Sequence, residues 1–249
     1  MKVYAIIPAR YGSTRFEGKP LAMIAGRPMI QHVYERAKTV ASVDQVVVAT
    51  DDERIRSVVE GFKGEAVMTR TDHATGTDRL AEAIEILDAG PEDIVVNIQG
   101  DQPAFHPRLI TEVIQPLKND PSLTMTTPAV PLTNVSEASD PNIVKVVFDQ
   151  NHRALYFSRA PIPWPRDGEE TNYFRHIGVY GYRVEFLCRF VSLPQGRLEV
   201  LERLEQLRAL EHGYPIKVII TDLVSPDVDV PSDIARVEEF LKNANKKFS

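Results

Sequence analysis

The sequence predicts an α/β protein with three layers: a mixed, mainly parallel sheet lies between helices, and an antiparallel lobe is inserted into it. Short apolar runs rich in valine and isoleucine alternate with amphipathic stretches, as strands and helices do when they follow one another along a chain. The runs are apolar on both faces, which favours strands buried between helices. After about residue 120 the runs alternate more and lie closer together, which is typical of antiparallel strands.

The main sheet and its helices can be placed from this alternation. The strands expected in the sheet are residues 3–8, 45–50, 65–69, 93–99 and 216–221. The helices expected around them are residues 28–39, 52–60, 77–88, 107–118 and 232–243. Thr50 and Glu53 have the spacing of a capping box, which predicts the start of the second helix.

The inserted lobe is expected over about residues 120–190. Its strands are expected at residues 124–130, 144–149, 154–158 and within 176–183. A long helical stretch should follow, over about residues 196–212, and the proline-rich segment 161–172 predicts an exposed loop. Because the last strand and helix resemble the first half again, we expect residues 1–249 to form a single domain.

Composition limits the kind of protein. The chain has 249 residues, 43% of them hydrophobic, and a net charge of −6, which argues against a nucleic-acid partner. We find no signal peptide and no run of the ~18 apolar residues that would span a bilayer, so we expect no membrane partner. A single cysteine, Cys188, fits a reducing compartment, and we expect a cytoplasmic protein. The apolar neighbours of Cys188 predict a packed core thiol.

The loop after the first strand, PARYGSTRFEGKP at residues 8–20, carries three cations: Arg10, Arg15 and Lys19. It lacks the GxGxxG of dinucleotide-binding loops, and its glycine spacing and the proline after Lys19 exclude a P-loop. Ligands of open α/β sheets bind at the carboxyl ends of strands, and forked guanidinium groups with an ammonium suit a triphosphate. We therefore favour phosphate binding over a solvated surface loop.

Two further segments carry candidate chemistry. A buried strand ends in NIQGDQP at residues 97–103, which places the carboxylate of Asp101 beside the first loop. One carboxylate facing phosphates suits Mg²⁺, although a turn aspartate explains the residue equally well. Thr75 and Gly76 precede a helix, where the alternatives are helix capping and a small loop beside a flat base.

These segments belong to long motifs that resemble those of the 3-deoxy-manno-octulosonate (KDO) cytidylyltransferase family. The opening signature IPARYxSxRxxGKPL is matched at residues 7–21, SGTDR at 75–79 with Thr75 in place of the serine, and NxQGDEP at 97–103. The further matches are ALYFSR at 154–159, HIGVYGYR at 176–183, LERLEQLRALE at 201–211 and VDTPED, as VDVPSD, at 228–233. The resemblance covers nearly the whole chain.

The resemblance implies a sheet of the nucleotide-diphospho-sugar transferase type and a Mg²⁺-dependent transfer from CTP to the acid sugar KDO. By the match, the residues on the triphosphate are Arg10, Ser13, Arg15 and Lys19, and those around the cytosine are Pro8, Ala9, Thr75 and Gly76. Gln99 borders the nucleotide and the sugar. The other residues on the acid sugar are Arg159, His176, Tyr180, Glu205 and Gln206. The metal ligands are Asp101 and Asp229, and the catalytic residues are Arg15, Lys19 and Asp101.

The chain departs from the family motifs at a few positions. Gln102 replaces a glutamate beside Asp101, and Val230 replaces a threonine beside Asp229. The loss of charge at Gln102 leaves open an amino-substituted relative of KDO as the substrate, and Asp222 and Asp227 compete with Asp229 as metal ligands. We expect a homodimer, partly from the family and partly from the aromatic residues of the 120–190 lobe.

Three alternatives have different sequence signatures. A CMP-sialate synthetase shares the opening signature but should differ in ALYFSR and LERLEQLR. A hexose-1-phosphate nucleotidyltransferase would carry a GxGxR loop, which is missing. A non-catalytic nucleotide-binding regulator would not need both aspartates and the acid-sugar residues.

Overall fold

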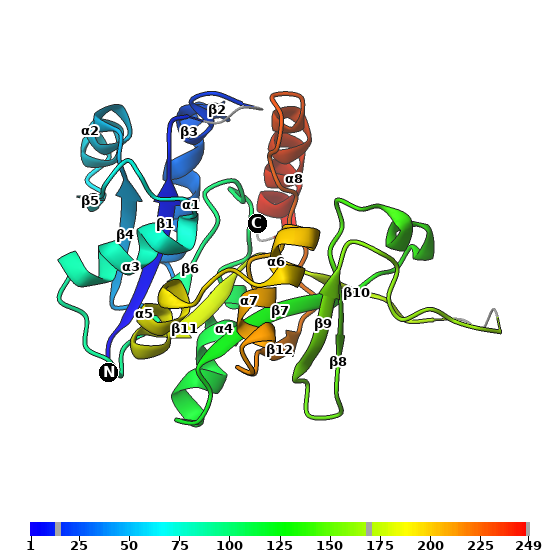
Figure 1. Cartoon of the computed structure of the whole chain (residues 1–249). Helices are drawn as coiled ribbons and strands as arrows, with labels where there is room; N and C mark the ends of the chain where they lie inside the picture. The colour runs from blue at the N-terminus through cyan, green and yellow to red at the C-terminus, as the bar shows by residue number, and fades with distance from the viewer. Residues whose placement is uncertain (13–15, 168–170, 248–249) are drawn as a thin grey trace.

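One mixed sheet runs through the structure and is covered by helices on both faces (Figure 1). The computed structural model describes residues 1–12, 16–167 and 171–247. In this part of the chain the sheet has ten strands, in the order β5-β4-β1-β6-β11-β7-β10-β8-β9, with β12 beside β7. The predicted fold class, a three-layer mixed sheet between helices, is confirmed.

The first half of the sheet is parallel. Its strands are β1 (Val3–Ala9), β4 (Gln45–Thr50), β5 (Ala66–Met68) and β6 (Ile94–Asn97), close to the predicted ranges. β1 pairs in parallel with both β4 and β6, so the carboxyl ends of these three strands meet at one edge. The loops that follow β1 and β6 therefore lie side by side.

The second half of the sheet is mostly antiparallel. Its strands are β7 (Met125–Pro131), β8 (Lys145–Phe148), β9 (Ala154–Ser158), β10 (Phe174–His176), β11 (Tyr180–Arg183) and β12 (Lys217–Ile220). β11 pairs antiparallel with β6, and the remaining strands extend the same sheet beyond it. β12 runs parallel to β7, so the last strand joins this half rather than the parallel half. A separate two-stranded ribbon is formed by β2 (Met23–Ile24) and β3 (Arg27–Pro28).

The alternating side chains of the buried strands build two cores. Val3, Ala5 and Ile7 of β1 pack against one layer of helices, and Tyr4 and Ile6 pack against the other. The first layer contains α1 (Met29–Lys38), α2 (Glu53–Gly61) and α4 (Arg108–Asn119). The second contains α3 (Gly76–Ile86), α5 (Val184–Ser192), α6 (Arg197–Glu202) and α7 (Leu207–Glu211). A strand that is apolar on both faces is thus explained by burial on both faces.

A third, smaller core holds the end of the chain. Val237 and Leu241 of α8 (Asp233–Lys247) pack with Ile24, Met29 and other apolar side chains beside the β2–β3 ribbon. Val228, in the segment before α8, is fully buried in the same cluster. This packing brings the C-terminal segment back to the edge where β1 and β6 end.

Several local predictions were wrong. The cap of α2 is Asp52, whose carboxylate accepts from the backbone N–H of Arg54, so Thr50 and Glu53 form no capping box. The helical stretch predicted over 196–212 is two short helices, because Arg203 adopts a left-handed backbone with φ of 52°. Helix α5 was missed, and Cys188 lies on its exposed face rather than in the core.

The prediction of an exposed loop over residues 161–172 is confirmed at Trp164, which is 77% exposed. In the described ranges, no helix combines the length and the apolar character needed to cross a membrane.

Gly181 tests how tightly the two halves of the sheet are packed. A Cβ at this position of β11 would lie 2.6 Å from Thr126 Oγ1 and 2.8 Å from Val113 Cγ1 of α4. We expect Gly181→Ala to lower the free energy of unfolding by about 1–3 kcal/mol, measured by urea denaturation, because the core must expand. Gly61→Ala is the control, since its Cβ would meet nothing within 4 Å. Equal free energies of unfolding for the two variants would contradict the close packing of β11 against β7 and α4 at Gly181.

Candidate active site

A cavity of 290 Å³ opens where β1 and β6 end, and we call it the β1 cavity. It collects almost all the residues predicted to contact the nucleotide, although they come from three separate parts of the chain. Those that line it are Pro8, Ala9, Arg10, Lys19, Thr75, Gly76 and Gln99, and the predicted metal ligand Asp101 lines it as well. Ser13 and Arg15, which were predicted to contact the triphosphate, lie outside the described residues.

The loop after β1 turns back at Gly18, and the turn places the next residue, Lys19, in the wall of the β1 cavity. Gly18 adopts a left-handed backbone with φ of 67°, which favours glycine, and its N–H donates to the carbonyl of Tyr11 at 2.9 Å. A Cβ here would also lie 3.1 Å from the Tyr11 ring. The next residue, Lys19, begins a 3₁₀ turn, and its ammonium donates to Asp101 at 2.8 Å.

The start of α3 forms another wall of the β1 cavity. Thr75 accepts from the N–H of Asp78 at 3.1 Å, and Asp78 accepts from the N–H of Thr75 at 3.0 Å, which is a complete capping box. Thr75 therefore caps the helix and also lines the cavity. The two interpretations of this segment do not exclude each other.

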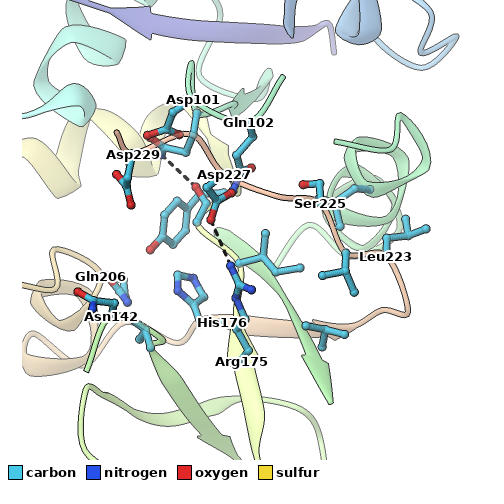
Figure 2. Close-up of a pocket in the computed structure, with 18 of the residues that line it drawn as sticks. Asp101, Gln102, Asn142, Arg175, His176, Gln206, Leu223, Ser225, Asp227 and Asp229 are labelled. Carbon is cyan, nitrogen blue, oxygen red and sulfur yellow. Dashed lines mark hydrogen bonds and ion pairs between the residues drawn. The ribbon is translucent and has the colours of Figure 1, made fainter. Parts of the chain in front are cut away.

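A second cavity, of 440 Å³, lies next to the first over β10, and we call it the β10 cavity (Figure 2). It collects most of the residues predicted to contact the acid sugar, together with both predicted metal ligands. Those that line it are Gln99, Asp101, Arg159, His176, Tyr180, Gln206 and Asp229. Glu205 lines neither cavity, because its carboxylate accepts from the hydroxyl of Thr77 at the start of α3.

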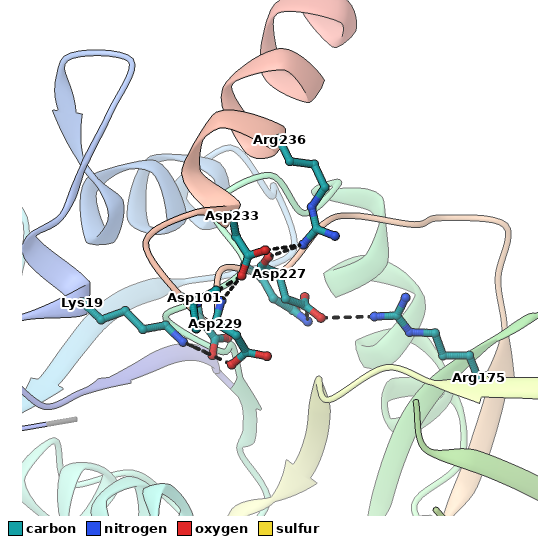
Figure 3. Close-up of polar contacts among 9 residues, drawn as sticks. Lys19, Asp101, Arg175, Asp227, Asp229, Asp233 and Arg236 are labelled. Carbon is teal, nitrogen blue, oxygen red and sulfur yellow. Dashed lines mark hydrogen bonds and ion pairs between the residues drawn. The ribbon is translucent and has the colours of Figure 1, made fainter. Parts of the chain in front are cut away.

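The two cavities share Gln99 and Asp101. Gln99 is fixed there because its amide donates to the carbonyl of Gly178 at 3.0 Å. The Lys19 ammonium, on the side of the β1 cavity, lies 2.8 Å from Asp101 and 3.8 Å from Asp229 (Figure 3). Groups held in the two cavities would thus meet beside a cluster of one cation and two carboxylates.

His176 is a neutral residue in the wall of the β10 cavity. Burial, and to a lesser extent Arg175, lowers the pKa of His176 to about 3. Its Nε2 lies 2.9 Å from the hydroxyl of Thr127, and that hydroxyl donates to the carbonyl of Val179 at 2.8 Å. The imidazole Nε2 must then carry the proton and donate to Thr127, which leaves Nδ1 as the acceptor.

Arg159 is held by backbone carbonyls. Its Nε donates to Glu202 O and its Nη1 to Pro141 O, each at 2.8 Å. The buried ammonium of Lys145 donates to the carbonyl of Arg159 at 2.5 Å and to that of Ile143 at 2.6 Å. These contacts join separate loops into one wall and fix the guanidinium beside the cavity.

Some residues of the two cavities were missed in the sequence. His73 and Arg79 line the β1 cavity, and Asn142 and Arg175 line the β10 cavity. His73 and Arg79 lie within a few residues of the predicted Thr75 and Gly76, so their proximity in sequence was the available signal. Asn142 and Arg175 come from segments that approach the cavity only through folding.

Asp101 and Asp229 are the residues that could hold a metal ion. They reach the same ammonium group from different segments, and Mg²⁺ is usually bound by one or two carboxylates plus phosphate oxygens and water. Among the described residues, no three His, Cys, Asp or Glu side chains converge as a complete metal site. The donor set fits an ion whose remaining ligands come from a bound phosphate.

The two competing aspartates have other contacts. Asp222 has an 80% exposed side chain, is paired with Arg108 and lines neither cavity. Asp227 lines the β10 cavity, where burial raises the pKa of its carboxyl and the charges of Asp101 and Asp229 raise it further. Arg175 opposes this shift.

Comparisons with known proteins agree with this geometry. A sequence model of the cytidylyltransferase family matches residues 4–219. A 3-deoxy-manno-octulosonate cytidylyltransferase from Desulfatibacillum aliphaticivorans is 59% identical over 98% of this chain and 100% of the relative. An 8-amino-3,8-dideoxy-manno-octulosonate cytidylyltransferase from Shewanella sp. (strain W3-18-1) is 51% identical over 97% of this chain and 99% of the relative.

The solved structures give the same answer. The structure of CMP:2-keto-3-deoxy-manno-octonic acid synthetase complexed with CTP has a TM-score of 0.93 to this chain at 44% identity, and the match covers 98% of this chain and 100% of that one. The fold implied by the motifs is thereby confirmed. Because the family model, the relatives and this structure agree along nearly the whole length, the protein belongs to the cytidylyltransferase family.

Proposed function

We propose that the protein transfers the cytidylyl group of CTP to KDO, giving CMP-KDO and pyrophosphate for lipopolysaccharide biosynthesis. The observation that carries the proposal is the junction of two cavities at Gln99 and Asp101. A relative at 59% identity carries the name of this activity, and the matched solved structure is a CMP-KDO synthetase with CTP. The β1 cavity would hold the nucleotide and the β10 cavity the sugar.

The reaction needs two substrates held in line at this junction. The anomeric 2-hydroxyl loses its proton to water as its oxygen forms a bond to the α-phosphorus, the bond from that phosphorus to the bridging oxygen breaks, and pyrophosphate leaves. Phosphoryl-transfer enzymes work mainly by positioning and by neutralising charge, so no covalent nucleophile is required. Lys19 lies at the junction and brings a positive charge to the reacting phosphate.

We include Mg²⁺ in the proposal. A bound Mg²⁺ neutralises phosphate charge and makes a nearby hydroxyl more acidic. Asp101 and Asp229 would hold the ion, while Lys19 lies between them and offsets their repulsion. Arg10, which is exposed in the β1 cavity, would bind the outer phosphates.

The sugar would be recognised by its acid group and hydroxyls. Arg159 supplies a fixed positive charge for the carboxylate, and His176 Nδ1 supplies an acceptor for a hydroxyl. Gln206 is 4% exposed, and its amide nitrogen has no hydrogen-bond partner within the described residues, so it offers a donor to the sugar. An 8-amino relative of KDO remains the second candidate substrate, because an enzyme named for it is 51% identical.

We also propose that the protein acts as a homodimer. Leu155, Trp164 and Leu201, in and around the antiparallel half, are 62%, 77% and 73% exposed. Exposed apolar side chains of this size are often covered by a symmetric partner. The cytoplasmic location expected from the sequence stays a prediction.

An assay of pyrophosphate release tests the function. We expect CTP with KDO to give pyrophosphate and CMP-KDO, and CTP to exceed UTP, ATP and GTP, because a pocket that pairs the polar edge of one base leaves its own groups unpaired with another. The acid-sugar panel should include 8-amino-KDO and sialic acid. No turnover with any of these sugars would overturn the proposal.

The two carboxylates at the junction should be needed for turnover. We expect Asp101→Asn and Asp229→Asn each to lower kcat about 10²-fold or more, because each removes a carboxylate that would hold the Mg²⁺ that neutralises charge at the phosphate. The variants keep side-chain size, and each leaves Lys19 paired with the other carboxylate, so thermal unfolding should stay near that of the wild type. Asp222→Asn is the control, since Asp222 lines neither cavity. Full activity of Asp229→Asn would remove it as a metal ligand.

His176 should make the fold sensitive to acid. Its pKa is about 3 in the folded protein and about 6.5 when unfolded, so between these values the unfolded chain binds more protons and stability falls as pH falls. Between pH 7.5 and pH 5.5, this residue should lower the free energy of unfolding by about 1 kcal/mol. His176→Gln keeps a donor for Thr127 and should lose less stability over that range, measured by urea denaturation. If the stability of the wild type and that of His176→Gln fell equally between pH 7.5 and pH 5.5, the inference that buried His176 stays neutral would be contradicted.

A further inference from the structure

We propose that Asp227 is a positioning residue that fixes the segment 222–230 and thereby places Asp229 opposite Asp101. Its carboxylate is held from two sides, by Gln102 and by Arg175, and we call these three residues the Asp227 clamp. The role assigned to Asp229 rests on the proposed function, but the clamp itself is a property of the fold. It joins the loop after β6, the strand β10 and the C-terminal segment.

The contacts of the clamp use both oxygens of the carboxylate. Gln102 Nε2 donates to Asp227 Oδ1 at 2.9 Å, and Arg175 Nη2 donates to Oδ2 at 3.1 Å. Gln102 is 6% exposed, and the side chains of Arg175 and Asp227 are 30% and 32% exposed. Figure 2 shows the three side chains converging in the β10 cavity.

The segment 222–230 depends on such contacts because it contains no helix or strand. Val228 anchors it, since the side chain is fully buried and the N–H donates to Asp101 O at 2.9 Å. Asp227 and Asp229 lie on either side of this anchor and both line the β10 cavity (Figure 3). On the far side, Asp233 accepts from the N–H groups of Asp229 and Val230 at 2.9 and 3.0 Å.

The identity of residue 102 follows from the presence of Asp227. The matched motif has glutamate at this position, but a glutamate would bring a second carboxylate against Asp227 Oδ1. That carboxylate already lies near Asp101 and Asp229, so the added charge would repel the segment. The amide of Gln102 instead supplies a donor without adding charge.

A reciprocal exchange should preserve the clamp. In Gln102→Glu with Asp227→Asn, the amide nitrogen of residue 227 can donate to the carboxylate of residue 102, and the amide oxygen can accept from Arg175. Both hydrogen bonds and the net charge of the pair are then kept. Gln102→Glu alone doubles the negative charge and removes the donor. Asp227→Asn should therefore reverse the effect of Gln102→Glu. Two substitutions at independent surface positions would instead have additive effects.

Hydrogen–deuterium exchange with peptide-level mass spectrometry tests the placement of the segment without any ligand. We expect amides of residues 222–230 to exchange about tenfold faster in Gln102→Glu, and to return to within about threefold of wild type in the double variant. Asp222→Asn is the matched control, because this carboxylate belongs to the same segment but contacts exposed Arg108. In Asp222→Asn, the amides of residues 222–230 should exchange at the wild-type rate.

Kinetics with CTP and the acid sugar supply the second measurement. Gln102→Glu should lower kcat about tenfold or more, with KM for CTP within about threefold, because residues 102 and 227 lie outside the β1 cavity. The double variant should recover most of kcat. If Gln102→Glu does not fold, recovery of folding by Asp227→Asn supports the clamp in the same way.

The outcomes separate the clamp from the function. A double variant that is no better than Gln102→Glu in exchange and in kcat, or a Gln102→Glu protein identical to the wild type, would overturn the clamp. A wild-type protein with no turnover of CTP and any acid sugar would overturn the proposed function, and the exchange experiment would still decide whether Asp227 orders the segment.

Discussion

The contact of one ammonium group with two carboxylates organises the centre of this molecule. Lys19 belongs to the loop after β1, Asp101 to the loop after β6 and Asp229 to the segment before α8. Three regions far apart in the sequence are thus held at one point on the sheet edge. Without the lysine, the negative charges of Asp101 and Asp229 would repel each other, so the ammonium favours their approach. The position of the C-terminal segment therefore depends on the loop after β1.

Strand ends and long motifs made part of this arrangement predictable. Ala9 ends the buried strand β1 and Asp101 follows β6, and these parallel strands end at the same edge, so the proximity of the two residues follows from topology. The position of the sugar residues came from the motif resemblance, since nothing in the spacing of Arg159 and Gln206 alone brings them together. Both do line one cavity, but no sequence pattern indicated that carbonyls of neighbouring loops hold the guanidinium of Arg159.

The wrong and missing predictions have local causes. The capping-box spacing at Thr50 was overridden because Asp52, two residues later, caps the helix with its own carboxylate. The single helix over 196–212 is divided by the backbone of Arg203, a conformation that a helical pattern does not reveal. The contact between Gln102 and Asp227 joins residues 125 positions apart, and only packing of the third core brings them together. Local sequence patterns, which span a few residues, cannot reveal contacts between residues so far apart in the chain.

The change of strand direction between β6 and β11 has an evolutionary consequence. On one side of this boundary the walls of the β1 cavity come from the parallel half, and on the other side the walls of the β10 cavity come mostly from the antiparallel half. Within the described part of the chain, the two cavities share a short border formed by Gln99 and Asp101. Substitutions can accumulate in one half while the other keeps its geometry. Such an architecture lets descendants diversify the lining of the β10 cavity while they inherit an unchanged β1 cavity.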